Sequence, residues 1–211
     1  MTQRGDIVNK NEKYSIEKYD SIAGTYDTSF DGKFTARFKQ EMLALCNVSD
    51  GDRVLDVGCG NGRLIYEISR RAKIKTYGVD ISPKMIEVCK QQYSGIEFDI
   101  SNGEDLPFED GCFDMLTICC VLHHLNNPSK FFTEARRVLV KNGTLIVGEP
   151  CFPLVIRKIT DWIVSPLIKA GDNKLFSHKR LIRLFTNNGF SIVEVYNKEF
   201  KQIVKGKKHD G

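Results

Sequence analysis

Long apolar runs and recognisable metal-ligand patterns are both missing from this chain of 211 residues. No apolar stretch approaches the roughly 18 to 20 residues that a helix needs to span a bilayer. The polar start MTQRGDIVNKNEK also lacks the apolar centre of a signal peptide. The sequence therefore predicts no membrane span, and we expect the protein to be cytoplasmic.

The seven cysteines form no C-x-x-C pair and no Cys/His spacing of the kind that binds zinc, so we expect no metal site. Several of them fall within apolar patterns, where a free thiol behaves as a small hydrophobe: Cys46, Cys89, Cys119 and Cys120. An odd number of buried thiols is typical of a reducing compartment, which agrees with a cytoplasmic location.

Strong charge is missing too, because the net charge is only +4. Basic residues are scattered except near the C-terminus, where we expect Lys201, Lys205, Lys207 and Lys208 to form a solvated cluster. Nucleic-acid-binding proteins usually carry a basic face, so we expect no nucleic-acid partner. A hydrophobic content of 41% and the lack of internal repeats predict a single domain over 1–211.

Short apolar runs alternate with helix-like patterns along most of the chain. Strands are predicted at 53–58, 75–80, 96–100, 113–119, 143–148, 190–196 and 199–204. Helices are predicted at 33–46, after the glycines at 58–62, after Ser82-Pro83, from Pro128 to Val140 before the stop signal Asn142-Gly143, and at 177–188. This order predicts an α/β fold, a Rossmann-like, doubly wound, seven-stranded and mostly parallel sheet with helices on both faces.

Three glycines at alternate positions follow the first predicted strand in the sequence RVLDVGCGNG, from 53 to 62. Glycine lets the chain turn sharply and brings bare backbone against a ligand. A dinucleotide turn needs a further glycine where Arg63 stands, and a phosphate loop needs a Lys-Ser or Lys-Thr pair that is also missing. Asp56 beside the turn would repel a pyrophosphate and attract an ammonium group. These features favour a ligand with a cationic end.

The segments LDVGCGNG, YGVDIS at 77–82, EDLPF at 104–108, LHHLNNP and EARRVLVKNGTLIVGEP occur in this order along the chain. Together, over Tyr19 to Pro150, they resemble the class I S-adenosylmethionine-dependent methyltransferases, above all the ubiquinone and menaquinone C-methyltransferases. The resemblance implies S-adenosylmethionine as the cofactor. It also implies methyl transfer to a small-molecule acceptor by in-line displacement.

By resemblance, the cofactor site lies at the carboxyl ends of the strands. Asp56 and the backbone from Gly58 to Gly60 would face the amino-acid end, and Asp80 would accept both ribose hydroxyls, although a cap on the next helix is its other possible role. Asn102 stands where the family usually has an acidic residue that accepts from the adenine amine, and an amide oxygen still accepts one hydrogen bond. The cofactor-binding residues implied are Tyr26, Asp56, Gly58, Cys59, Gly60, Asp80, Ile81, Met85, Asn102, Gly103, Glu104 and Cys120.

Two histidines follow the fourth predicted strand, where the methyl acceptor should arrive. Adjacent residues in an extended segment point in opposite directions, so we expect one of them to face the site. By resemblance His124 has a packing and hydrogen-bonding role, which leaves His123 as the candidate base. Glu149, at the end of the next predicted strand, is a second candidate for orienting or deprotonating the acceptor.

Two segments outside the alternation are expected to cover the site. Residues 1–32, here called the leader, resemble a segment that closes over the cofactor, with Tyr19 and Tyr26 near the sulfonium or packed as anchors. Residues 151–176 are apolar and predict a small helical lid insertion, or else a helix that covers the edge of the core. Their composition favours an apolar or aromatic acceptor.

Two other functions stay open from the sequence. One is a nicotinamide-binding dehydrogenase, against which Arg63 argues. The other is a non-catalytic S-adenosylmethionine-binding regulator, which Asn102 and the lack of an unmistakable base favour. The acceptor atom and the oligomeric state are not predicted.

Overall fold

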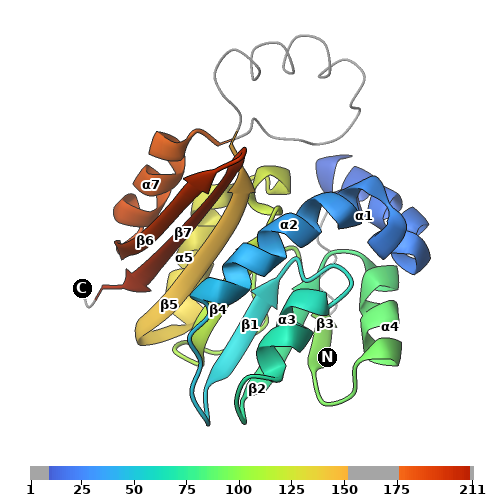
Figure 1. Cartoon of the computed structure of the whole chain (residues 1–211), viewed down its shortest axis with the longest axis horizontal. Coiled ribbons are helices and arrows are strands. Elements are labelled where there is room, and N and C mark those ends of the chain that lie inside the picture. The colour runs from blue at the N-terminus through green and yellow to red at the C-terminus, as the bar shows by residue number, and fades with distance from the viewer. Residues whose placement is uncertain (1–9, 152–175, 210–211) are drawn as a thin grey trace.

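A computed structural model describes residues 10–151 and 176–209, which form one seven-stranded sheet with helices on both faces (Figure 1). The strand order is β3-β2-β1-β4-β5-β7-β6. Neighbours from β3 to β5 are parallel, whereas β7 is antiparallel to both β5 and β6. The strands are β1 (Arg53–Val57), β2 (Lys75–Asp80), β3 (Glu97–Ile100), β4 (Phe113–Cys119), β5 (Leu139–Pro150), β6 (Phe190–Lys198) and β7 (Lys201–Lys208). The predicted fold class is confirmed.

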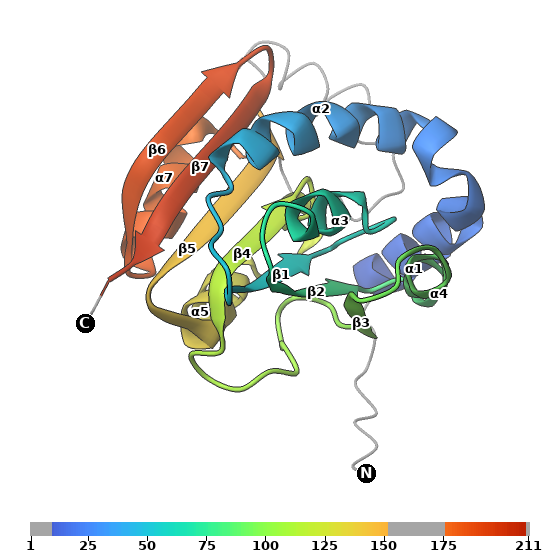
Figure 2. The ribbon, with the colours of Figure 1, turned by 60° about the horizontal axis from the view of Figure 1, so that its bottom comes forward.

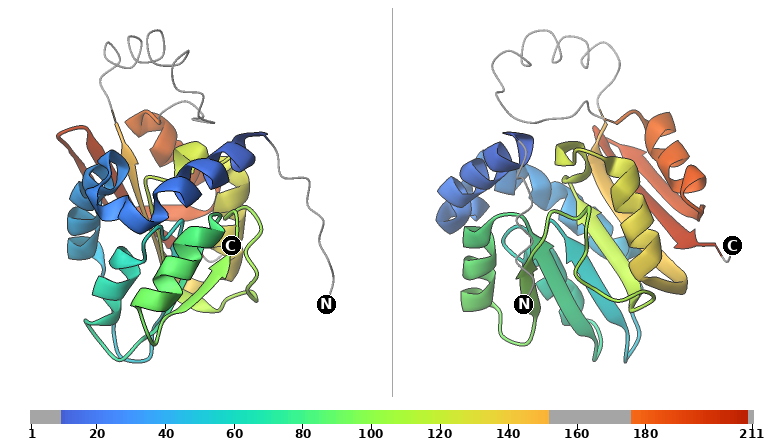
Figure 3. Two further views of the ribbon diagram at one scale, coloured as in Figure 1. Left: turned by 90° about the vertical axis from the view of Figure 1, so that its right-hand side faces the viewer. Right: turned by 180° about the vertical axis from the view of Figure 1, so that it is seen from behind.

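Helices lie on both faces of the sheet (Figure 3). The sheet separates two apolar cores, each closed by its own helices. Phe38 and Met42 of α2 pack with α3 and α4 on one face, and α5 and α7 cover the other. On that second face the fully buried rings of Phe132 and Phe185 meet edge to face, with centroids 5.1 Å apart. The helices are α2 (Phe30–Leu45), α3 (Arg63–Ser69), α4 (Pro83–Gln92), α5 (Pro128–Val138) and α7 (His178–Asn187).

The helix starts follow the sequence signals. Ser82 caps α4, because its Oγ accepts from the backbone N–H of Met85 at 3.1 Å and Pro83 occupies the first helical position. Asn127 and Ser177 cap α5 and α7 in the same way. The predicted cap at Ser82 is therefore confirmed, and the loop between β2 and α4 has a fixed geometry.

The predicted end of the helix that begins at Pro128 is wrong. Helix α5 ends at Val138, and β5 begins at once at Leu139. Asn142 has a positive φ of 58° inside this strand, where β5 advances from Leu139 to Thr144 while β4 advances from Phe113 to Met115. The Asn-Gly pair therefore forms an irregularity in the strand and does not stop a helix, since both residue types tolerate tight backbone turns.

The leader contains helices that the sequence did not predict. Helix α1 (Lys10–Ile22) and the 3-10 helix η1 (Ala23–Thr28) precede α2, which begins at Phe30 and is capped by Ser29. Figure 2 shows α1 beside α4. The contact is polar as well as apolar, because Asp20 accepts from the Ser82 hydroxyl at 2.5 Å and from the Lys84 N–H at 3.2 Å.

The lid prediction for 151–176 falls almost wholly on residues outside those that the structure describes. Within residues 10–151 and 176–209, no helix has the length and apolar character required to cross a membrane. Over the same ranges, no group of three or more His, Cys, Asp or Glu side chains is placed to hold a metal ion.

Candidate active site

A cavity lies where β1, β2 and β4 end, beneath the leader. Its empty volume is about 840 Å³, including space at the open mouth. In parallel sheets, ligands bind at this carboxyl edge. The structure brings ten of the predicted site residues to its wall: Tyr26, Gly58, Cys59, Gly60, Asp80, Ile81, Met85, Asn102, Glu104 and Cys120. Four others are not part of the wall: Asp56, Gly103, His123 and Glu149.

The glycine turn after β1 forms the floor of the cavity. Gly58 and Gly60 both have positive φ values, of 66° and 54°, which glycine adopts without strain. A Cβ on Gly58 would lie 2.3 Å from Cγ2 of Val121, so the close approach also requires glycine. The Tyr26 ring lies over Gly60, about 3.8 Å from where a Cβ would be.

Asp80 is the carboxylate of the cavity and is held rigidly. The Gly60 N–H donates to its Oδ2 at 2.8 Å and the Ser82 N–H donates to its Oδ1 at 2.9 Å. The side chain is nearly buried, and burial raises the pKa of this carboxyl above its usual range. Because a carboxylate has about four acceptor positions, Asp80 is fixed by the backbone and can still accept from a ligand.

Asp56 lies beneath the cavity, away from its wall. It is 2% exposed, and the hydroxyl of its cross-strand neighbour Thr117 donates to its Oδ1 at 2.7 Å. Burial is the main cause that raises the pKa of Asp56 to about 7. Thr117 is the register partner of Asp56 on β4, so the two side chains lie side by side on the sheet.

The loop after β3 forms the far end of the cavity. Asn102 Oδ1 accepts from the Glu104 N–H at 2.9 Å, and Glu104 Oε1 accepts from the Asn127 N–H at 3.0 Å. Gly103 turns behind the wall with φ 77°, where a Cβ would lie 2.9 Å from Val57 Cγ1. Side chains and backbone thus tie this loop to the start of α5.

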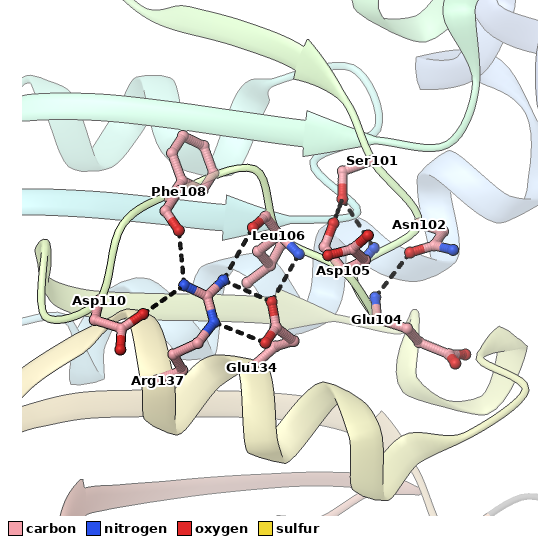
Figure 4. A network of polar contacts seen from close by, with 10 residues as sticks. Ser101, Asn102, Glu104, Asp105, Leu106, Phe108, Asp110, Glu134 and Arg137 are labelled. Atoms are coloured by element: carbon pink, nitrogen blue, oxygen red, sulfur yellow. Dashed lines mark hydrogen bonds and ion pairs between the residues drawn. The ribbon is translucent and has the colours of Figure 1, made fainter. Parts of the chain in front are cut away.

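Arg137 of α5 holds the same loop from behind (Figure 4). Its guanidinium donates to both oxygens of Glu134, at 2.8 and 2.7 Å, and to the carbonyls of Phe108 and Leu106 at 2.7 and 3.0 Å. The hydrogen bonds from Arg137 are also the main cause that lowers the pKa of Glu134. This arrangement was not predicted from the sequence, because the arginine lies about 30 residues from the carbonyls that it binds.

The leader and helix α2 supply one wall of the cavity with an aromatic and a basic side chain. Tyr26 is buried and its hydroxyl lies 3.2 Å from Thr35 Oγ1, and burial raises its pKa. Lys39 of α2 also lines the wall and donates to Asn61 Oδ1 at 3.1 Å. Lys39 was missed from the sequence, because only the fold brings α2 to the glycine turn.

The two histidines lie in the 3-10 helix η2 (Leu122–His124), with ring centroids 4.1 Å apart. His124 faces the cavity, and its Nε2 lies 3.1 Å from the hydroxyl of Tyr19. His123 is buried beside the fully buried Glu149, with Nδ1 2.7 Å from Oε2. The choice of His123 as the cavity-facing histidine is therefore corrected, because the residues are in a helical turn and the extended geometry assumed for them does not apply.

Glu149 serves a second contact inside the protein. Its Oε1 accepts from the backbone N–H of Leu122 at 2.8 Å, while Oε2 binds His123. Both carboxylate oxygens are thus used to fix η2 against the end of β5. The two residues predicted as catalytic form a buried pair behind the wall.

Comparison with known proteins identifies the family. A family model described as a methyltransferase domain matches residues 48–207. An uncharacterised protein of Methanocaldococcus jannaschii is 33% identical over 187 residues, covering 89% of this chain and 87% of that protein. The demethylmenaquinone methyltransferase of Symbiobacterium thermophilum is 30% identical over 184 residues, covering 76% and 72%. That of Tropheryma whipplei is 33% identical over 121 residues, and this chain spans only half of its length.

Solved structures share the fold at lower identity. An S-adenosylmethionine-dependent methyltransferase of Thermotoga maritima has a TM-score of 0.72 at 21% identity, covering 91% of this chain and 99% of that chain. A chain solved in a complex with the Haloferax volcanii Trm112 methyltransferase activator has a TM-score of 0.76 at 19% identity, covering 92% and 98%. The family match, the curated relatives and the fold agree. The chain belongs to the class I S-adenosylmethionine-dependent methyltransferases and resembles the quinone methyltransferases.

Proposed function

We propose that the protein transfers a methyl group from S-adenosylmethionine to a small-molecule acceptor bound in this cavity. The observation that carries the proposal is the rigid Asp80 carboxylate beside a backbone turn of positive-φ glycines, in a chain of this family. When bound, S-adenosylmethionine supplies an electrophilic methyl group on a sulfonium sulfur. The family match gives no support to the dehydrogenase alternative.

The cavity wall offers a different partner for each part of the cofactor. Asp80 accepts from the ribose hydroxyls, and the nearby side chains of Ile81 and Met85 give apolar contact to the adenine ring. The backbone from Gly58 to Gly60 faces the amino-acid end. Lys39, the cation on this part of the wall, is suited to the carboxylate of that end.

Tyr19 and His124 are the groups placed to handle a proton of the acceptor. Their hydroxyl and imidazole share a hydrogen bond at the cavity wall, so a proton taken up by the phenol oxygen can pass to Nε2. His123 and Glu149 act as positioning residues, because they fix η2 from behind. Alignment of the acceptor with the methyl group supplies most of the rate acceleration, because it lowers the activation barrier by about 7 to 11 kcal/mol in favourable cases.

The acceptor we infer is an apolar or aromatic molecule. Demethylmenaquinone methyltransferases are among the relatives, and Val121 and Leu125 add apolar surface to the wall beside His124. We further propose that the chain is one domain in which the leader closes over the cofactor. Segment 151–176 as a lid stays a prediction.

Binding of the cofactor is the first test. Titration calorimetry should detect S-adenosylmethionine and S-adenosylhomocysteine at micromolar dissociation constants, and Asp80→Ala should weaken both by about 100-fold, since hydrogen bonds to a charged group are lost. Glu87→Ala, on the exposed side of α4, is the matched control and should bind normally. Equal affinities of Asp80→Ala and the parent protein would refute the ribose assignment.

Turnover is the second test. Demethylated quinols, phenols and amines are offered with S-adenosylmethionine, and release of S-adenosylhomocysteine is measured. We expect turnover with an aromatic acceptor and its loss in Tyr19→Phe or His124→Ala. Tight cofactor binding without turnover on any acceptor class would support the regulator alternative.

A further inference from the structure

The end of the cavity beyond Asp80 must recognise adenine if the proposed function holds. Adenine has an exocyclic amino group that donates hydrogen bonds, so a selective pocket needs an oxygen acceptor for it. The polar side chains that line this end of the wall include three candidate acceptors, namely Glu12, Asn102 and Glu104. Their existing contacts decide which of them can accept.

Asn102 is turned the wrong way for this role. Its Oδ1 accepts from the Glu104 N–H at 2.9 Å (Figure 4). Its Nδ2 donates to Glu12 Oε1 at 3.3 Å. The amide oxygen therefore stabilises the turn of its own loop, while the amide nitrogen is a donor. A second donor opposite the adenine amine would repel it.

Glu104 is committed to the scaffold. It is 8% exposed, and its Oε1 accepts from the Asn127 N–H at the start of α5 at 3.0 Å. Losing this bond would leave the N–H at the cap of the helix without its partner, which is costly in a buried place. Glu104 thus joins two loops, and a ligand contact is left to its second oxygen, Oε2.

Glu12 has the right chemistry and place. It lies on α1, and its Oε1 accepts from Asn102 Nδ2 at 3.3 Å and from Asn126 Nδ2 at 3.2 Å. The two amides come from the loops after β3 and β4, so they hold the carboxylate between those loops at the cavity wall. Both bonds are made to side-chain amides.

We propose that Glu12 accepts the hydrogen bond from the adenine amine and that Asn102 positions it. The inference rests on the proposed function, since it concerns the same cofactor. A carboxylate supplied by α1 makes adenine selectivity depend on docking of the leader. A base with a keto oxygen in place of the amine is rejected, because that oxygen faces a negative charge.

The test compares two ligands within each protein. Calorimetry measures the dissociation constants of S-adenosylhomocysteine and of S-inosylhomocysteine, which has the keto group. The parent protein should prefer the adenine form by about 10- to 100-fold, as expected for a hydrogen bond to a charged group. In Glu12→Ala the preference should fall to within about threefold. Because each preference is a ratio within one variant, a partly unfolded sample does not change it.

A matched control and a rescue complete the experiment. Glu17→Ala removes an exposed glutamate of the same helix and should keep the full preference. Adding Asn102→Asp to Glu12→Ala should restore the preference, because it returns a carboxylate to this end of the cavity. The same two ligands are used for both proteins.

The outcomes separate the inference from the proposed function. An undiminished preference in Glu12→Ala overturns the role of Glu12 and leaves the cofactor assignment intact. Failure of the parent protein to bind either ligand overturns both. Loss of preference in Glu17→Ala as well as in Glu12→Ala would attribute the effect to the helix as a whole and would overturn the specific contact.

Discussion

Arg137 joins α5 to the loop that follows β3, and its replacement by alanine should destabilise the protein strongly. The guanidinium makes two hydrogen bonds to Glu134, whose side chain is only 15% exposed, and two to the loop carbonyls. A second carboxylate, Asp110, lies 2.9 Å away but is 81% exposed, so solvent screens it and it adds little.

The magnitude follows from these contacts. The half-buried pair with Glu134 contributes about 2 kcal/mol, and each bond to a carbonyl contributes about 1 kcal/mol. Arg137→Ala should therefore lower the free energy of unfolding by about 4 kcal/mol, which corresponds to a fall in Tm of roughly 8 to 16 °C for a chain of this size. Arg137→Lys keeps the charge but not the planar guanidinium with its several N–H donors, so the loss in free energy of unfolding should be about half as large.

Thermal and urea unfolding followed by circular dichroism measure these effects. Arg37→Ala, at an exposed position on α2, is the control and should change Tm by less than about 2 °C. Arg137 lowers the pKa of Glu134, so the stabilisation is present above the usual pKa of a glutamate and is lost as pH falls through the lowered one. A Tm for Arg137→Ala within the range of the control, or a cost that does not shrink in acid, would refute the reasoning.

Three further predictions concern the sheet, the glycine turn and the core. Burial raises the pKa of Asp56 from 3.8 to about 7. The free energy of unfolding of the parent protein therefore falls as pH rises through this range, because the buried carboxyl must lose its proton. Asp56→Asn does not titrate, so its free energy of unfolding, measured in urea, should gain about 4 kcal/mol relative to the parent protein between about pH 4 and pH 8. Gly58→Ala should lower the free energy of unfolding by at least about 2 kcal/mol, because the new Cβ would clash with Val121. Gly51→Ala, where φ is +94° and no atom lies within 4 Å of the new Cβ, should lower it less. Equal losses in the two variants would contradict this. Phe132→Ala should cost about 3 to 5 kcal/mol from a cavity in the core, and a loss below about 1 kcal/mol would show that the core closes around it.

The strands and most helix starts could be predicted from the sequence, because their signals are local. Buried parallel strands are short apolar runs bounded by glycine or proline, and Ser82 acts on a residue three positions away. The wrong prediction of a helix end at Asn142 has a local cause as well. An Asn-Gly pair fits both a helix end and a turn within a strand, and pairing with β4 decides between them.

The site was predictable where it follows the strands and unpredictable where it depends on contacts across the chain. Asp80 and the glycines lie at strand ends, so their place at the cavity follows from the fold alone. Glu12 and Lys39 bind partners that are 22 to 114 residues distant, and Arg137 binds loop carbonyls 29 and 31 residues away. No spacing rule reports such contacts. The histidines were exchanged because a short 3-10 helix has no signal of its own in the sequence.

The family match begins at residue 48, yet Glu12, Tyr19, Tyr26 and Lys39 on the cavity wall all precede it. The cavity therefore has a floor of strand ends within the family match and a roof, formed by residues before position 48, outside it. We expect exchange of these first 47 residues between relatives to alter ligand choice while the strand pairing, which begins at Arg53, is kept. We expect directed evolution toward a new acceptor to concentrate its changes in that roof.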